Sequence, residues 1–275
     1  MKAGIGWSIV AAIALASAVM VLYSLREAGP PPAIPPVIPL AGQSPSPPGQ
    51  AEPGTMPPIR YPIEAVVTSA ELPDAAPLPA LDKSDAALRT ALDALFAKGG
   101  QSRTLLLEDM IRRIVVTVDS LPREQVARRL VPLKPAEGSL LVTGRGAERV
   151  ISEHNQGRYA PYVILAEGVD VDYLAALYVR FYPLFQQAYQ ELGYPEGYFN
   201  DRLVSVIDHL LATPELKGPI RLVQPKVLYK FADPELEQLS VGQKFLVRMG
   251  PANAARIKMR LREVRRHVAG RMPEP

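Results

Sequence analysis

Five polar residues fall on one face of a predicted helix over residues 199–212, and their types could support acid–base chemistry. They are Asp201, Arg202, Ser205, Asp208 and His209. Side chains three and four residues apart are neighbours on a helix, so both carboxylates lie next to the serine. Carboxylate and imidazole groups at this spacing could act as general acid and base, or supply half of a metal site. The alternative, which the sequence favours, is an exposed helix face held by salt bridges.

No recognised motif supports that chemistry elsewhere in the chain. His154 and His267 lie in unrelated contexts, and no H-E-x-x-H or nucleophile-elbow spacing occurs. The turn at residues 144–146 lacks the rest of a nucleotide-binding loop. We therefore predict no catalytic residue, no metal site and no cofactor. Four residues remain as candidate binding residues: Asp201, Arg202, Asp208 and His209.

A basic helix near the C-terminus is a second candidate surface. Gly250-Pro251 favours a helix start, and an apolar stripe follows at Ile257, Leu261, Val264 and Val268. Six basic residues against one glutamate give a net charge of +5 on the rest of the helix: Arg256, Lys258, Arg260, Arg262, Arg265 and Arg266. Such a helix can bind anionic lipid or another polyanion. The favoured alternative is a terminal helix that docks by its apolar stripe and is otherwise solvated.

The N-terminal residues predict a membrane anchor over residues 1–27. Residues Ile5 to Leu25 form twenty-one positions without a charge, which is long enough to cross the lipid bilayer once as a helix. The flanking charges favour an N-terminus inside and the bulk of the chain outside. Two alternatives stay open. Ala16-Ser17-Ala18 could be a signal-peptide cleavage site, and the reverse topology would place the basic helix against anionic cytoplasmic lipid.

A proline-rich segment over residues 28–80 follows the anchor. It contains sixteen of the twenty-nine prolines, which exclude regular helix and central strand. We expect a disordered, partly stiff spacer of polyproline character. Recognition of the prolines by an aromatic-lined groove is the less favoured alternative.

Residues 81–270 predict one compact, mostly helical domain, so the fold class is mainly α. Helices are expected from residue 82 or 84 to 96, over 108–118, over 171–192 and over 199–212. The β-branched run at 114–118 leaves a strand open as the alternative to the second helix. Residues 140–143 and 149–151 predict a small β-hairpin. Eight of the eighteen aromatic residues lie between Tyr178 and Phe199, where they form either core or a groove for a ligand.

Composition adds few constraints on function. The chain contains no cysteine, which excludes disulfides and thiolate chemistry. Its net charge of +3 is mild, so we expect no nucleic-acid partner.

Long stretches of the domain are similar to a known family. They are residues 111–119, 158–163, 182–195, 199–215, 221–237 and 242–262. The chain resembles domain-of-unknown-function family three thousand and fourteen over nearly everything beyond Leu81. The resemblance implies a proteobacterial protein with an N-terminal membrane span and a proline-rich linker, and it carries over no activity and no site residue.

Together these observations predict a single-pass protein of the bacterial inner membrane whose C-terminal domain lies in the periplasm. We expect a non-enzymatic interaction or scaffold module with an envelope protein or polymer as partner, and the oligomeric state stays open. The alternative is a periplasmic hydrolase acting on an envelope polymer. A pocket beside Asp201, Asp208 and His209 would favour the hydrolase.

Overall fold

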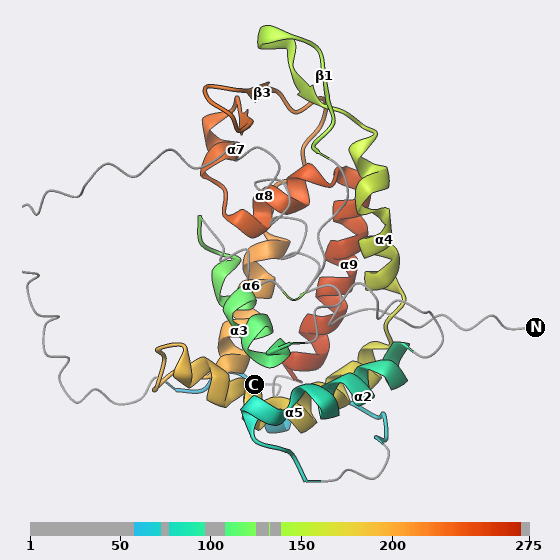
Figure 1. Cartoon of the computed structure of the whole chain (residues 1–275), viewed down its shortest axis with the longest axis vertical. Helices are drawn as coiled ribbons and strands as arrows, with labels where there is room; N and C mark the ends of the chain where they lie inside the picture. The colour runs from blue at the N-terminus through green and yellow to red at the C-terminus, as the bar shows by residue number, and fades with distance from the viewer. Residues whose placement is uncertain (1–57, 73–76, 97–107, 125–131, 133–138, 271–275) are drawn as a thin grey trace, which may run out of the picture.

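The computed structural model describes residues 58–72, 77–96, 108–124, 132 and 139–270 of the 275-residue chain. These residues form a mainly helical domain with small antiparallel β-hairpins, which confirms the predicted fold class for this part of the chain (Figure 1). The predicted membrane span at Ile5 to Leu25 and most of the proline-rich segment lie outside the described residues. Within the described ranges, no helix combines the length and the apolar character that a membrane crossing needs.

The helices, in chain order, are α2 (Asp85–Phe96), α3 (Met110–Ser120), α4 (Asn155–Glu167), α5 (Val171–Glu191), α6 (Phe199–Leu211), α7 (Pro234–Gln238), α8 (Val241–Arg248) and α9 (Pro251–Val268). The strands are β1 (Val142–Thr143), β2 (Val150–Ile151), β3 (Leu222–Val223) and β4 (Lys230–Phe231). Short 3₁₀ turns occupy Ile63–Ala65, Leu81–Lys83 and Gly146–Glu148.

The C-terminal helix α9 lies at the centre of the domain. It packs against α4, α5, α6 and α8, and in Figure 1 it runs down the middle of the fold. Its predicted apolar stripe is buried, with Ile257, Leu261, Val264 and Val268 all inside the main core. α9 therefore contacts other helices on several sides and not along one stripe alone.

The helix prediction over residues 108–118 is confirmed against its strand alternative. The β-branched residues Ile114, Val115 and Val118 recur on one face of α3 and are buried in the main core. Burial of this stripe outweighs the modest strand preference of the individual residues. α5 is likewise continuous past Pro183, whose ring is exposed.

The aromatic residues between positions 178 and 199 form core, not a ligand groove. Phe185 stacks on Phe199 with ring centroids 5.7 Å apart, and Tyr189 stacks on Tyr194 at 4.6 Å. Tyr178 meets Tyr182 edge to face at 5.6 Å. The Phe185–Phe199 contact joins α5 to α6, and the other two lie within α5 or between α5 and the turn that follows it.

Two hairpins combine at one end of the domain. The predicted hairpin is confirmed, with Val142 opposite Ile151. A second hairpin, β3 with β4, was not predicted. Val150 bridges to Arg221, and the Leu222 N–H donates to the Arg149 carbonyl at 2.8 Å, so the strands lie in the order β1, β2, β3, β4. We call residues 139–152 and 216–232 the hairpin lobe; Figure 1 shows it at the end opposite α2 and α5.

Helix α8 begins where α3 ends, and a glycine permits the close approach. The N–H groups of Val241 and Gly242 donate to the carbonyls of Arg123 (2.8 Å) and Leu121 (3.0 Å). A Cβ on Gly242 would lie 2.6 Å from Leu210 Cδ2 and 3.2 Å from the Leu121 carbonyl oxygen. The junction of α3, α6 and α8 therefore has no room for a side chain at this position.

We expect Gly242→Ala to lower the free energy of unfolding by roughly 1–3 kcal/mol, because the added methyl overpacks this junction. The matched control is Gly157→Ala in α4, where a Cβ would meet nothing within 4 Å. That substitution should raise the free energy of unfolding by up to about 1 kcal/mol through helix propensity. Urea denaturation of both variants checks the prediction, and equal effects would contradict it.

Candidate functional site

The polar face predicted on α6 exists, but its side chains contact different parts of the chain. Asp201, Arg202, Asp208 and His209 all lie on the less buried side of the helix. The apolar side of α6, with Leu203, Val204, Val206, Ile207 and Leu210, is buried in the core. The contacts of the polar residues determine whether the face could do chemistry.

Asp201 binds a segment from the region that the sequence assigned to the linker. Its carboxylate accepts hydrogen bonds from the backbone N–H of Arg60 at 3.0 Å and of Tyr61 at 2.7 Å. We call residues 58–72 the N-terminal strap. Asp172 on α5 holds its other end, accepting from the Ser69 N–H at 2.9 Å and the Ser69 hydroxyl at 2.6 Å. The packed domain thus includes residues ahead of the boundary predicted at position 81.

The strap is also bound at its middle. The Ile63 N–H donates to the Tyr198 hydroxyl at 2.8 Å, and the Val67 N–H donates to the His267 carbonyl at 3.2 Å. Burial opposes the ionisation of Asp172, but its hydrogen bonds from the strap and the nearby His267 together lower the pKa of that carboxyl. The strap is therefore held by one carboxylate at each end and by neutral contacts between them.

Arg202 binds a buried carboxylate that the sequence analysis did not single out. Its Nε donates to Asp119 Oδ1 at 3.0 Å, and its Nη2 donates to the Asp119 carbonyl at 2.9 Å. Asp119 is only 3% exposed, and Arg123 and the Tyr194 hydroxyl contact its other oxygen. The spacing of Asp119 and Arg123, four residues apart at a helix end, is the signal that could have identified this cluster.

The last two residues of the face tie α6 to α9 and α8. Asp208 forms a two-pronged salt bridge with Arg265. His209 Nε2 lies 2.8 Å from the Ser240 hydroxyl, which caps α8 by accepting from the Gln243 N–H. Burial, and then the charge of Arg202, lower the pKa of His209. This favours the neutral imidazole, which can accept the proton of Ser240.

The four candidate side chains therefore do not converge on a common point. Each one secures a different partner: the N-terminal strap, α3, α9 or the start of α8. Among the residues that the structure describes, no group of three His, Asp or Glu side chains is placed to hold a metal ion. The contacts of these four side chains are structural.

The predicted basic helix uses most of its cations inside the molecule. Arg256 pairs with Glu167 on α4, and Arg260 donates to the Val169 carbonyl at 2.9 Å. Lys258 is only 4% exposed and donates to the Thr213 carbonyl just past the end of α6. With Arg265 bound to Asp208, only Arg262 and Arg266 of the six are exposed. α9 therefore does not present a six-cation surface.

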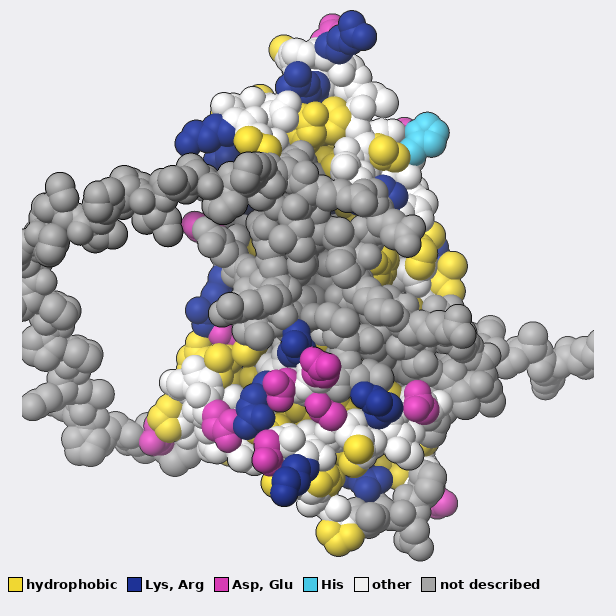
Figure 2. Space-filling model, in the orientation of Figure 1, with side chains coloured by type: hydrophobic (Ala, Val, Ile, Leu, Met, Phe, Trp, Pro, Cys, Tyr) yellow, Lys and Arg dark blue, Asp and Glu magenta, His cyan; other side chains and the backbone are white. Residues whose placement is uncertain are grey.

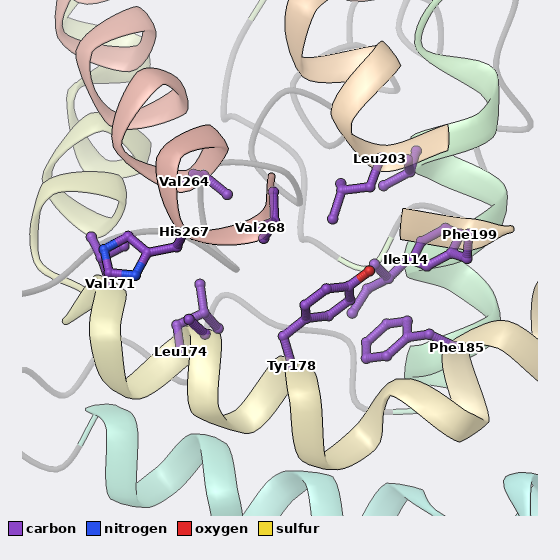
Figure 3. A pocket seen from close by; sticks show the side chains of 12 residues that line it. Ile114, Val171, Leu174, Tyr178, Phe185, Phe199, Leu203, Val264, His267 and Val268 are labelled. Atoms are coloured by element: carbon purple, nitrogen blue, oxygen red, sulfur yellow. The ribbon is translucent and has the colours of Figure 1, made fainter. Parts of the chain in front are cut away.

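An apolar cavity lies between α3, α5, α6 and α9 (Figure 3). Its volume is about 60 Å³, well below the roughly 300 Å³ at which small-molecule pockets begin. The Tyr178 ring lines the cavity, while its hydroxyl donates to Asn200 Oδ1 at 3.1 Å. Burial raises the pKa of Tyr178, so this hydroxyl stays protonated. His267 also lines the cavity, but the cavity is too small for a small-molecule ligand and is a packing gap in the core.

Larger hollows flank the hairpin lobe along residues 216–221. One, of about 650 Å³, lies against the start of α4 and the junction of α8 with α9; the other, of about 460 Å³, lies against residues 232–236. Both volumes suit a ligand or a partner segment. The first hollow includes Ser152 and His154, and the second includes Lys217 and Arg221.

The hairpin lobe also exposes apolar and basic side chains together. Val223, Val227 and Leu228 are 43%, 56% and 39% exposed. The lobe also carries five exposed cations: Arg145, Lys217, Arg221, Lys226 and Lys230. Figure 2 shows dark-blue and yellow side chains next to each other at this end of the molecule. These residues are spread over more than eighty positions, so only the pairing of the two hairpins reveals the surface.

The comparisons with known proteins identify a family and nothing beyond it. A family described as "Protein of unknown function (DUF3014)" matches residues 110–265, which runs from the start of α3 almost to the end of α9. No curated protein and no solved structure matches the chain. The match covers α3, the hairpin lobe and α4 to α8, so both the α6 face and the lobe belong to the family domain.

We expect Asp119→Ala to lower the free energy of unfolding by roughly 2–3 kcal/mol, because it leaves the guanidinium groups of Arg202 and Arg123 without their carboxylate. The matched control is Glu191→Ala, which breaks the exposed pair between Glu191 and Arg112. Exposed pairs contribute little, so this control should be almost neutral. Urea denaturation of the two variants checks the difference, and similar losses would contradict the structural role of Asp119.

The lowered pKa of His209 gives a pH dependence with a definite sign. Its folded-state pKa lies below the ordinary value of 6.5, so the unfolded state binds more protons below that pH and stability falls as the pH decreases. We expect His209→Gln to lose less stability than the unchanged protein between about pH 7 and pH 5. Denaturation at both pH values measures this, and parallel losses in the two proteins would refute it.

Proposed function

We propose that this chain, which belongs to the DUF3014 family of proteins of unknown function, is a non-enzymatic interaction module of the bacterial cell envelope. One observation carries the proposal. The side chains that could have done chemistry on α6 hold the domain together, whereas the hairpin lobe directs apolar and basic side chains outward. A surface of exposed apolar and basic side chains suits the binding of a partner more than the catalysis of a reaction.

A buried amide side chain joins the lobe to α4. Asn155, only 1% exposed, donates to the carbonyls of Leu141 (2.6 Å) and Ser152 (2.8 Å) and accepts from the Leu141 N–H at 2.9 Å. This amide fastens the base of the first hairpin to the start of α4. A rigid surface loses little conformational entropy on binding, which favours affinity.

A small hydrophobic core of its own supports the lobe from within. Leu140, Leu222 and Phe231 pack with Val247 of α8, separately from the main core. The guanidinium group of Arg248 lies over the Phe231 ring, 5.1 Å from its centroid. The two hairpins are thereby fixed to α8 as well as to α4.

The proposed setting is the periplasmic side of the inner membrane of a Gram-negative cell. It rests on the apolar residues Ile5 to Leu25, on the charges that flank them, and on the proline-rich spacer of residues 28–80. In the described domain, the strap contacts α5, the start of α6 and the end of α9, which lie away from the hairpin lobe (Figure 1). A domain tethered through this strap would direct the lobe away from its tether.

Photocrosslinking from the lobe in intact cells tests the proposal. The full-length chain carries a photoreactive residue in place of Val227 on the lobe or, as the matched control, in place of Ile164 on α4, which is similarly exposed at 53%. We expect discrete adducts with an envelope component from position 227 and none of these from position 164. The adducts are identified by mass spectrometry.

Two results would overturn the proposal. One is the absence of any adduct specific to position 227. The other is hydrolysis of an envelope polymer by the purified full-length chain, provided that His209→Ala abolishes the activity while circular dichroism shows an unchanged fold.

A further inference from the structure

We infer that the hairpin lobe docks on an anionic phospholipid surface, with the β3–β4 hairpin entering the headgroup region first. The inference rests on the proposed function and names the class of partner for the same surface. It differs from the lipid-binding helix considered from the sequence, because most cations of α9 are engaged inside the fold.

The charge of the lobe is strongly one-sided. Its two segments carry six cations and one carboxylate, Glu148, which gives a net charge of +5. Among the described residues, no salt bridge involves Arg145, Lys217, Arg221, Lys226 or Lys230. Arg149, the sixth cation, is half-buried and donates to Gln224 Oε1 at 3.2 Å. Five exposed cations therefore remain available to phosphate groups.

Exposed aliphatic side chains lie close in the chain to two of these cations, Lys226 and Lys230. Val227 and Leu228 occupy the connection between β3 and β4, and Val223 ends β3. Side chains of this kind gain free energy when they enter the boundary between headgroups and acyl chains. Lys226 lies directly beside Val227 in the chain and can keep its ammonium group at headgroup level while its stem contacts the apolar layer.

The composition of the lobe favours lipid over a protein partner. Protein interfaces are dominated by aromatic and arginine anchors that fill pockets on the partner. The aromatic residue of the connection, Tyr229, is half-buried beneath Arg149, whose guanidinium carbon lies 5.9 Å from the ring centroid. The exposed apolar residues are instead short aliphatics on a hairpin connection, with cations on both sides.

Nearby carboxylates indicate the orientation of docking. Glu153 and Asp233 directly follow the two lobe segments, Glu215 directly precedes the second segment, and all three are exposed. An anionic surface would repel them. The connection between β3 and β4 therefore faces the lipid, and the start of α4 and of α7 faces away from it.

The expected strength follows from the charges. Each Lys or Arg near an anionic leaflet contributes about 1 kcal/mol, or roughly a fivefold gain in affinity. Replacing Lys226 and Lys230 by glutamine should therefore weaken docking roughly 25-fold. Raising the salt concentration should weaken it further, since exposed charges are screened over about 10 Å at 0.1 M salt.

The absence of cysteine allows a position-specific test. The full-length chain is reconstituted in neutral phosphatidylcholine vesicles with a polarity-sensitive dye on Val227→Cys or, as the control, on Ile164→Cys. A second population of vesicles is added, made either of phosphatidylcholine alone or of phosphatidylcholine with phosphatidylglycerol. We expect a rise in dye emission only at position 227 and only with the anionic vesicles.

Two double variants in the labelled chain separate the lobe from α9. Lys226→Gln with Lys230→Gln should weaken the response roughly 25-fold, whereas Arg262→Gln with Arg266→Gln, which removes the exposed cations of α9, should leave it unchanged. Thermal unfolding confirms that both variants fold. The inference is overturned if position 227 does not respond to anionic vesicles, responds equally to neutral ones, or depends on the α9 cations instead.

The same experiments distinguish this inference from the proposed function. If the dye at position 227 fails to respond but the crosslinker at that position captures a specific envelope protein, the lipid inference is wrong and the interaction module stands. If both fail, the proposed function fails with it.

Discussion

A strongly basic helix at the centre of the domain is the constraint on which the rest of the structure depends. α9 packs against α4, α5, α6 and α8, yet it carries six cations between Arg256 and Arg266. A buried cation without a partner would cost several kcal/mol. Lys258, which is buried, donates to the Thr213 carbonyl after α6, and the partly exposed Arg256 and Arg265 pair with Glu167 of α4 and Asp208 of α6. These contacts join α9 to α4 and to α6, and the apolar stripe of α9 lies in the main core.

The long amphipathic helices could be predicted from the sequence because their pattern is local. α5, α6 and α9 each repeat apolar residues at helical spacing over three turns or more, and the structure confirms all three. α4 was missed because Gly157 and Pro161 interrupt its pattern. α8 was missed although Ser240 and Gln243 form a capping box, which is a readable start signal. The second hairpin has strands of two residues each, too short for any period to show.

The partners of the candidate site could not be predicted, because they lie far away in the chain. The polar face of α6 was found by its spacing, but Asp201 bonds to a residue 141 positions earlier and Asp208 to one 57 positions later. No short-range pattern reports such pairings. The same limit applies to charge. The number of cations in each segment can be read from the sequence, but not which of them a carboxylate neutralises. The cations of α9 were therefore predicted as a basic surface, whereas the exposed cations of the lobe were not.

The strap gives the domain a defined response to tension on its N-terminal side. A pull from that direction would reach the contacts one after another, first Arg60 and Tyr61 on Asp201, then Ile63 on Tyr198, then Val67 on the His267 carbonyl, and finally Ser69 on Asp172. Contacts loaded in sequence separate singly and under less force than contacts that share a load. Releasing residues 60–69 would free a segment that spans roughly 30 Å when fully extended, and part of that length is already spanned in the bound strap. The strap is thus a reserve of length that yields under load while the hairpin lobe keeps its shape.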